Sequence, residues 1–173
     1  MVFLATAVAC SGGGGKASKT TTVSHLALSS SAFVDGGSIP PQFTCDRHEG
    51  ELSLSWDRIV PGAVELALVM EDPDARGGTY VHWTLWGISP SRMVLDVGSP
   101  PPEAKEGANS SGPPGYISPC PPPGELHHYV FTLYALSRHI RLQTGASASQ
   151  LTTAVKAAVV AEGRLTGTYT RGG

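Results

Sequence analysis

The stretch from Gly107 to Leu136 joins a loop rich in glycine and proline to an apolar segment with two histidines at its entrance. Each proline fixes one backbone dihedral, and glycines permit the turns between them. A flexible linker would not carry an aromatic and a cysteine, yet Tyr116 and Cys120 lie inside this loop. We interpret this loop, called the proline-rich wall below, as a pre-ordered segment that holds His127 in a fixed position. It is therefore interpreted as part of a binding site.

Acidic residues form a second chemically dense stretch. Glu71, Asp72 and Asp74 directly follow the apolar run Val64–Met70, which has the character of a central strand covered on both faces. Unpaired charge is costly to bury, so these carboxylates must lie at the end of that strand, outside the core. There they would face a partner or water.

The motifs of several enzyme classes are missing from the sequence. It contains no G-x-S-x-G nucleophile elbow, no Walker-type phosphate loop and no H-E-x-x-H pair. Prolines surround Cys120, which makes it a poor candidate for an activated thiolate. Two histidines and one aspartate could hold a metal, so a metal-dependent hydrolase stays a less favoured alternative. We predict that the protein is not an enzyme and needs no cofactor.

Size and charge are those of one globular domain. The chain has 173 residues, a net charge of -2 and 40% hydrophobic residues, without the basic excess of a nucleic-acid-binding protein. No apolar run is long enough to span a bilayer. We expect a single domain over residues 23–173.

Residues 1–22 have the composition of a leader and tether. An apolar start ends in Ala7-Val8-Ala9-Cys10, which resembles a bacterial lipobox although Ala7 replaces a larger aliphatic residue and no basic residue precedes it. The pattern predicts lipidation of Cys10 and a location in the cell envelope, lipid-anchored or exported. The alternative is an ordinary flexible tail on a cytoplasmic protein. Membrane contact is expected only through this anchor.

Two cysteines then remain, Cys45 and Cys120. An even pair in an oxidising compartment predicts a disulfide that pins the loop around Cys45 to the proline-rich wall. The alternative is a pair of buried free thiols.

Alternation and helical spacing predict the elements that position these residues. A capping box at Ser147 and Gln150 begins the one helix, with an apolar stripe to Val159 and Gly163 as its stop. Met93–Glu106 is expected to be an irregular loop. Strands are predicted within 26–44 and over 51–56, 64–70, 80–88, 128–136 and 165–170.

The order and spacing of these motifs resemble the phosphatidylethanolamine-binding protein family, in its bacterial branch often labelled Raf-kinase-inhibitor-like. The resemblance covers about Leu26 to Arg171. It implies a mainly β fold, with a large central sheet packed on a smaller one, one C-terminal helix and short helical turns. The matching residues are Ile39-Pro40, Thr44-Cys45-Asp46, Asp72-Pro73-Asp74-Ala75, His82-Trp83, Gly107 through Tyr116, Pro119-Cys120-Pro121-Pro122, Gly124, His127, Tyr129, Leu133-Tyr134-Ala135-Leu136 and Leu165-Thr166-Gly167-Thr168-Tyr169.

Two departures from the family pattern border the implied site. Arg76 stands where a proline is usual, and Ser118 where a glycine is usual. Arg76 could add a guanidinium fork at the rim, or it could be a solvated arginine in a turn.

The resemblance also implies a small pocket for phosphate or a phospholipid head group. Carried over by position, its lining is Asp72, His82, His127 and Tyr129, with Pro121 and the backbone of Gly115 and Tyr116 completing the rim. Imidazoles and a hydroxyl can donate to an anion, while Asp72 would orient a histidine. The predicted function is therefore non-catalytic binding of small anions or phosphorylated head groups. The alternative, also implied by the resemblance, is an inhibitor of an unidentified kinase or protease that acts through its surface.

Overall fold

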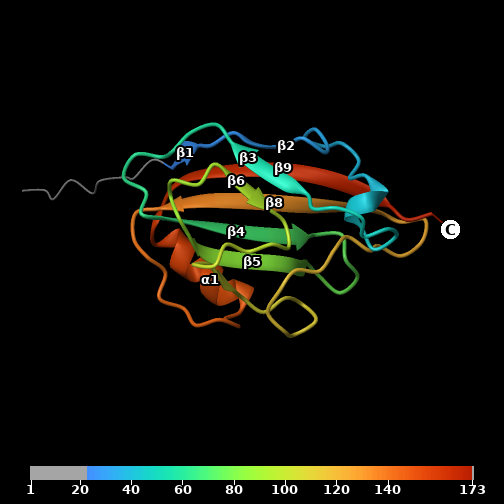
Figure 1. The fold of residues 1–173 in the computed structure, drawn as a ribbon. Coiled ribbons are helices and arrows are strands. Elements are labelled where there is room, and N and C mark those ends of the chain that lie inside the picture. The colour runs from blue at the N-terminus through green and yellow to red at the C-terminus, as the bar shows by residue number, and fades with distance from the viewer. Residues whose placement is uncertain (1–22, 173) are drawn as a thin grey trace, which may run out of the picture.

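The computed structural model describes residues 23–172, which form two β-sheets and one α-helix (Figure 1). The large sheet has six strands in the order β1-β9-β8-β4-β5-β7, and the small sheet has three in the order β2-β3-β6. Along the chain the elements are β1 (Ser24–His25), β2 (Leu28–Ser30), the 3-10 turn η1 (Pro41–Phe43), β3 (Ser53–Trp56), β4 (Glu65–Asp72), β5 (Tyr80–Ile88), β6 (Val94–Asp96), β7 (Lys105–Glu106), β8 (Leu126–Leu136), α1 (Ala148–Lys156) and β9 (Val159–Thr170). This is the mainly β architecture that the resemblance implies.

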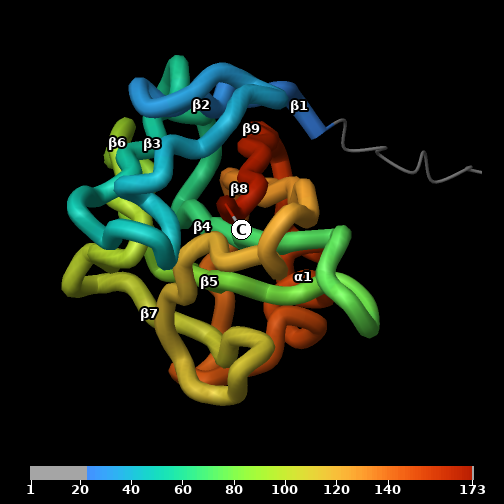
Figure 2. Tube along the Cα trace, turned by 90° about the vertical axis from the view of Figure 1, so that its right-hand side faces the viewer, coloured from blue at the N-terminus to red at the C-terminus, as the bar shows by residue number. Residues whose placement is uncertain are grey.

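Strand β4 is buried on both faces, as its apolar run predicts. Leu68 and Met70 join the core shared with the small sheet, whereas Ala67 and Val69 join the core beneath α1. Figure 2 shows the resulting layers, with β2, β3 and β6 on one side of the large sheet and α1 on the other. The acid at the start of the strand, Glu65, is 3% exposed and accepts hydrogen bonds from two backbone amides and a histidine ring.

Helix α1 begins as predicted and ends early. Ser147 accepts from the backbone amide of Gln150, whose side chain accepts from the amide of Ser147 in return, which completes the capping box. The helix ends at Lys156, so Gly163 is not its stop but a residue of β9. The apolar spacing continues past the helix because Val159 and Ala161 are already in an antiparallel strand paired with β8.

Other boundaries also differ from the predictions. Strand β8 begins at Leu126, two residues before the predicted start at His128, so that His127 is within the sheet. The region predicted as an irregular loop over Met93–Glu106 contains the short strands β6 and β7. Their pairing with β3 and β5 is a tertiary contact that local sequence does not reveal.

The chain enters the large sheet at the end remote from the start of β8. Strand β1 pairs in parallel with the beginning of β9, where Ser24 lies opposite Ala161. No helix within residues 23–172 has the length and apolar character needed to cross a bilayer. The predicted leader and lipidation of Cys10 lie outside the described residues.

Gly163 marks a close approach between β9 and the chain that follows β1. A Cβ atom at this position would lie 2.3 Å from the carbonyl oxygen of Leu26, a backbone atom of a residue whose amide donates to the Glu162 carbonyl in β9 at 2.8 Å. We therefore expect Gly163→Ala to lower the free energy of unfolding by about 1–3 kcal/mol. Denaturant unfolding measures this change.

The matched control is Gly172→Ala, where an added Cβ would meet nothing within 4 Å. This control should stay within about 0.5 kcal/mol of the unchanged protein. Equal stabilities for the two variants would contradict the close approach.

Candidate functional site

Strand register brings the predicted site residues to one end of the large sheet. Asp72, the last residue of β4, lies opposite Tyr80 at the start of β5. On the other side of β4, Glu71 lies opposite Val130, near the start of β8. Because both neighbouring strands are antiparallel to β4, the end of β4 meets the beginnings of β5 and β8.

A cavity of about 320 Å³ opens at this end of the sheet. Five of the seven residues predicted to form the site line it, namely Asp72, His82, Pro121, His127 and Tyr129. The other lining residues are Ala75, Arg76, Tyr80, Ile117, Ser118, Cys120 and Pro122. The proline-rich wall thus faces the two histidines across the cavity.

His127 is held by a buried hydrogen bond to Asp72. Its Nδ1 lies 2.6 Å from Asp72 Oδ2, and both side chains are 5% exposed. Burial disfavours the charged imidazole, but the bond to Asp72 and the charge of that carboxylate outweigh it and raise the pKa of His127. The ring is therefore biased toward the imidazolium form, with Nε2 as its remaining donor.

His82 has the opposite electrostatic character. Its Nδ1 lies 2.8 Å from the carbonyl oxygen of Ile117, so this nitrogen carries the hydrogen. Burial lowers the pKa of His82, against the favourable effects of that carbonyl and of Asp72. A neutral His82 with this tautomer has a lone pair on Nε2, and it can donate from Nε2 only after protonation.

The hydroxyl of Tyr129 is a buried polar group without a partner. The residue is 0% exposed, and its oxygen has no hydrogen-bond partner within residues 23–172. Burial and the nearby Asp72 raise the pKa of this phenol, against a smaller lowering by the nearby backbone of Cys120, so it stays protonated and can donate. An unpaired buried hydroxyl costs free energy, which a bound acceptor would offset.

Gly115 and Tyr116, predicted at the rim, are not among the residues that line the cavity. The Gly115 carbonyl accepts from the side-chain amide of Asn109 at 3.0 Å. The Tyr116 ring packs edge-on against Trp83, with centroids 5.9 Å apart, and its burial raises its pKa. The loop therefore directs this aromatic side chain into the core rather than toward the cavity.

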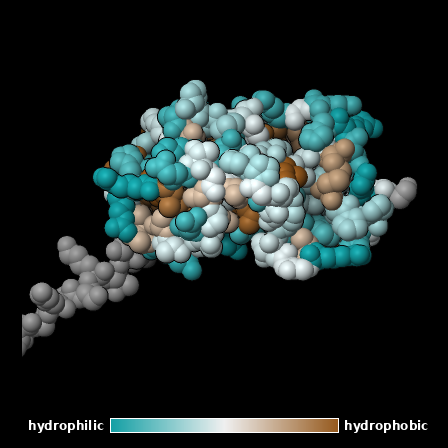
Figure 3. Space-filling view, turned by 90° about the horizontal axis from the view of Figure 1, so that it is seen from below, coloured by the Kyte–Doolittle hydropathy of each residue, from teal (hydrophilic) through white to brown (hydrophobic). Residues whose placement is uncertain are grey.

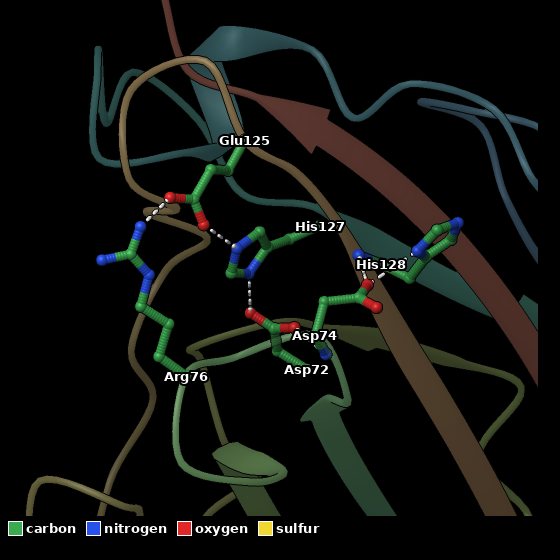
Figure 4. Close-up of polar contacts among 6 residues, drawn as sticks. All are labelled: Asp72, Asp74, Arg76, Glu125, His127 and His128. Atoms are coloured by element: carbon green, nitrogen blue, oxygen red, sulfur yellow. Dashed lines mark hydrogen bonds and ion pairs between the residues drawn. The ribbon is translucent and has the colours of Figure 1, made fainter.

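Glu125 contacts two residues of the cavity, and the sequence reasoning missed it. Its carboxylate forms an ion pair with Arg76, and its other oxygen, Oε2, lies 3.6 Å from His127 Nε2 (Figure 4). Residues two apart in an extended chain point to the same side. The spacing of Glu125, His127 and Tyr129 therefore contained a signal that could have identified it.

The neighbouring histidine points elsewhere, as alternation predicts. His128 binds Asp74, with Nδ1 at 2.7 Å from Oδ2, and it does not line the cavity. Asp74 also accepts from the His128 backbone amide at 2.8 Å. Asp74 thus fixes the acidic turn to β8 and is not a cavity residue.

A disulfide fastens the wall to the rest of the domain. Cys45 and Cys120 are bonded, with their Cα atoms 5.3 Å apart, and the Cys45 amide donates to the Pro119 carbonyl at 3.0 Å. Because Cys120 lines the cavity, this bond fixes one side of the site. Within residues 23–172, no group of three or more His, Cys, Asp or Glu side chains is arranged to hold a metal ion.

Comparison with known proteins gives a consistent family. Residues 29–170 match the family described as phosphatidylethanolamine-binding protein. The LppC protein of Mycobacterium tuberculosis, named as a lipoprotein, is 40% identical over 177 residues that cover 92% of this chain and 88% of LppC.

Two crystal structures share the fold. A phosphatidylethanolamine-binding protein homologue from Chlamydia trachomatis has a TM-score of 0.78 and 32% identity, covering 85% of this chain and 98% of its own. YbcL of E. coli, described as a member of the mammalian family, has a TM-score of 0.76 and 26% identity, covering 84% of this chain and 98% of its own.

The hydrogen bond to Asp72 should control the titration of His127. We expect Asp72→Asn to lower the pKa of His127, because the substitution removes the negative charge that favours the imidazolium. NMR titration of the histidine rings measures this pKa. In the control Asp74→Asn, which removes a weaker influence on the same ring, the pKa of His127 should fall less. An unchanged His127 titration in Asp72→Asn would refute the assignment.

Proposed function

This chain belongs to the phosphatidylethanolamine-binding protein family, and from that membership we propose that its cavity binds a phosphate-type anion, free or as a phospholipid head group, without chemical turnover. The observation that carries the proposal is the buried pair of His127 and Asp72. A carboxylate on one side of the ring favours a positive charge whose second donor faces the cavity mouth.

Further donors converge on the same space. The Tyr129 hydroxyl is unpaired within residues 23–172, and the Arg76 guanidinium also lines the cavity. The Ser118 hydroxyl lies there too, but it is hydrogen-bonded to His48 Nε2 at 3.1 Å. Hydrogen bonds to a charged acceptor are stronger than those between neutral groups. One imidazolium with neutral hydroxyls and a peripheral guanidinium therefore suits an anion of low charge.

His82 adds a dependence on protonation. In its neutral form it presents a lone pair on Nε2, so it can donate a hydrogen bond to an anion only when it is protonated. Anion binding would itself favour the protonated ring, because an adjacent negative charge raises the pKa of a histidine.

The size and walls of the cavity suit a head group. Ile117, Pro121 and Pro122 form an apolar side opposite the polar one. About 320 Å³ is at the small end of ligand pockets, enough for a phosphate with a short substituent and too small for two acyl chains. A phospholipid would therefore place its polar end here and leave its chains outside.

We further propose that the protein works in the cell envelope, lipid-anchored through Cys10. Three observations support this location: the lipobox-like pattern before Cys10, the lipoprotein name of LppC and the Cys45–Cys120 disulfide, which fits an oxidising compartment. Mass analysis of the mature protein from cells should find a lipidated N-terminal cysteine, and Cys10→Ala should release the protein from the membrane fraction. A mature chain that retains Met1 in the cytoplasm would contradict the proposal.

Binding of dimethyl phosphate should depend on His127 and on pH. Removing the imidazolium in His127→Ala should weaken binding at least about tenfold, since a hydrogen bond to a charged group contributes about 1.5–3 kcal/mol. This probe keeps a single charge near neutrality, so its affinity should fall as pH rises through the folded pKa of His127, which lies above its ordinary value. NMR titration at several pH values measures both effects.

The control is His128→Ala, which removes the adjacent imidazole that binds Asp74 outside the cavity. It should retain the affinity and pH profile of the unchanged protein. Equal loss in both variants, or binding that survives His127→Ala, would refute the site. An inhibitor that acts only through its surface would tolerate the His127 change.

A further inference from the structure

The carboxylate of Glu125 lies between the two cationic groups at the cavity mouth. One of its oxygens pairs with the Arg76 guanidinium, and the other lies 3.6 Å from His127 Nε2 (Figure 4). This nitrogen is the one that the bond to Asp72 leaves available. Glu125 therefore occupies the position in which an anionic ligand would meet the same two groups.

The ionised groups in the cavity and at its mouth cancel one another when His127 is protonated. Asp72 and Glu125 supply two negative charges, and Arg76 and protonated His127 supply two positive ones. Neutral His82 adds none. Neither Glu125 nor Asp74 is among the lining residues, but Glu125 contacts Arg76 and His127 directly. Asp74 is paired with His128 and acts on His127 more weakly than Glu125 does.

Resting on the proposed anion site, we propose that Glu125 makes the cavity selective for singly charged phosphodiesters over doubly charged phosphomonoesters. In a cavity without net charge, a monoanion leaves one uncompensated negative charge and a dianion leaves two. The second charge carries a larger desolvation cost that no additional cation offsets.

Glu125, rather than Asp72, is positioned to discriminate between phosphodiesters and phosphomonoesters. Asp72 is buried, and its two oxygens already accept from His127 and from the backbone amide of Asp74. The Glu125 side chain is 36% exposed at the mouth, where the outer oxygens of a bound phosphate would lie. A phosphodiester carries an ester group there, whereas a phosphomonoester carries its second charge.

The ion pair with Arg76 does not remove the repulsion between the Glu125 carboxylate and a dianionic ligand. The Arg76 side chain is 79% exposed, and exposed ion pairs hold their partners weakly. The guanidinium can therefore turn toward a ligand while the Glu125 carboxylate stays near His127. Arg76 would strengthen binding of either ligand, and Glu125 would penalise the dianion more.

Figure 3 shows a different face of the molecule, where hydrophobic colour is confined to small patches among polar residues. The hollow near α1, lined by Leu142, Ser149, Gln150, Thr153 and Ala154, has no charged side chain. The cavity lined by Arg76 and His127, both of which Glu125 contacts, therefore offers the more specific chemistry.

The test compares methyl phosphate, mostly a dianion at pH 7.5, with dimethyl phosphate, a monoanion of nearly the same size. Glu125→Gln keeps the side-chain length and removes its charge. One unit charge about 5 Å away in a partly solvated site corresponds to about a tenfold change in affinity. We expect the ratio of the methyl phosphate Kd to the dimethyl phosphate Kd to fall about tenfold, as measured by NMR titration.

Two controls distinguish the effect of the Glu125 charge at the cavity from the effect of the net charge of the protein. Glu162→Gln removes an exposed acid near the far end of β9, so it changes the net charge of the protein but should leave the ratio unchanged. The double variant Arg76→Gln with Glu125→Gln restores a neutral cavity and should return the ratio toward that of the unchanged protein. Thermal unfolding verifies that each variant is folded.

A ratio that stays within twofold in folded Glu125→Gln, while both probes bind, would overturn the selection and leave the anion site intact. Failure of both probes to bind the unchanged protein and Glu125→Gln would instead refute the proposed function, and the selection with it. Vesicles of phosphatidylglycerol distinguish a lipid from a free phosphodiester as the source. Selection among the soluble probes supports the proposal with either source.

Discussion

The buried hydrogen bond between Asp72 and His127 is the interaction on which the chemistry of the cavity depends. A carboxylate and an imidazole that are each 5% exposed would be costly to bury separately, and they are tolerable because they satisfy each other. The bond fixes the tautomer of His127, biases the ring toward its charged form and directs Nε2 toward the mouth. The roles assigned to Glu125 and Arg76 follow from that direction.

The sheet makes this pairing possible by joining segments far apart in sequence. Asp72 ends β4 and His127 opens β8, 55 residues later, and the antiparallel register of these strands brings them together. The disulfide and the His82 bond to Ile117 then hold the proline-rich wall against the strand ends. Rigid strands and a fastened loop thus position the cavity side chains before any ligand arrives.

The longer strands could be predicted from sequence because local patterns of apolar residues indicate which of their faces are buried. The apolar run before Asp72 and the alternation after His128 identify β4 and β8, and the capping box identifies the start of α1. The edge strands β6 and β7 could not be predicted, because two or three residues become strands only through their partners. Four of the five predicted site residues that line the cavity are in β4, β5 and β8, where strand alternation specifies the direction of a side chain. The fifth, Pro121, belongs to the proline-rich wall. Tyr116 belongs to a loop whose side-chain direction depends on tertiary packing against Trp83.

The two ends of β9 have different neighbours, which matters for handling the protein. Ser24 pairs with Ala161, whereas His127 pairs with Tyr169, about 26 Å farther along the strand at the usual rise per residue. Near that second end, the carbonyl of Arg171 accepts from the amide of Gly124, three residues before the cavity residue His127. An affinity tag or sensor-chip linkage placed ahead of Val23 would leave the ligand entrance open to solution. The same attachment beyond Arg171 would crowd that entrance and distort any affinity measured there.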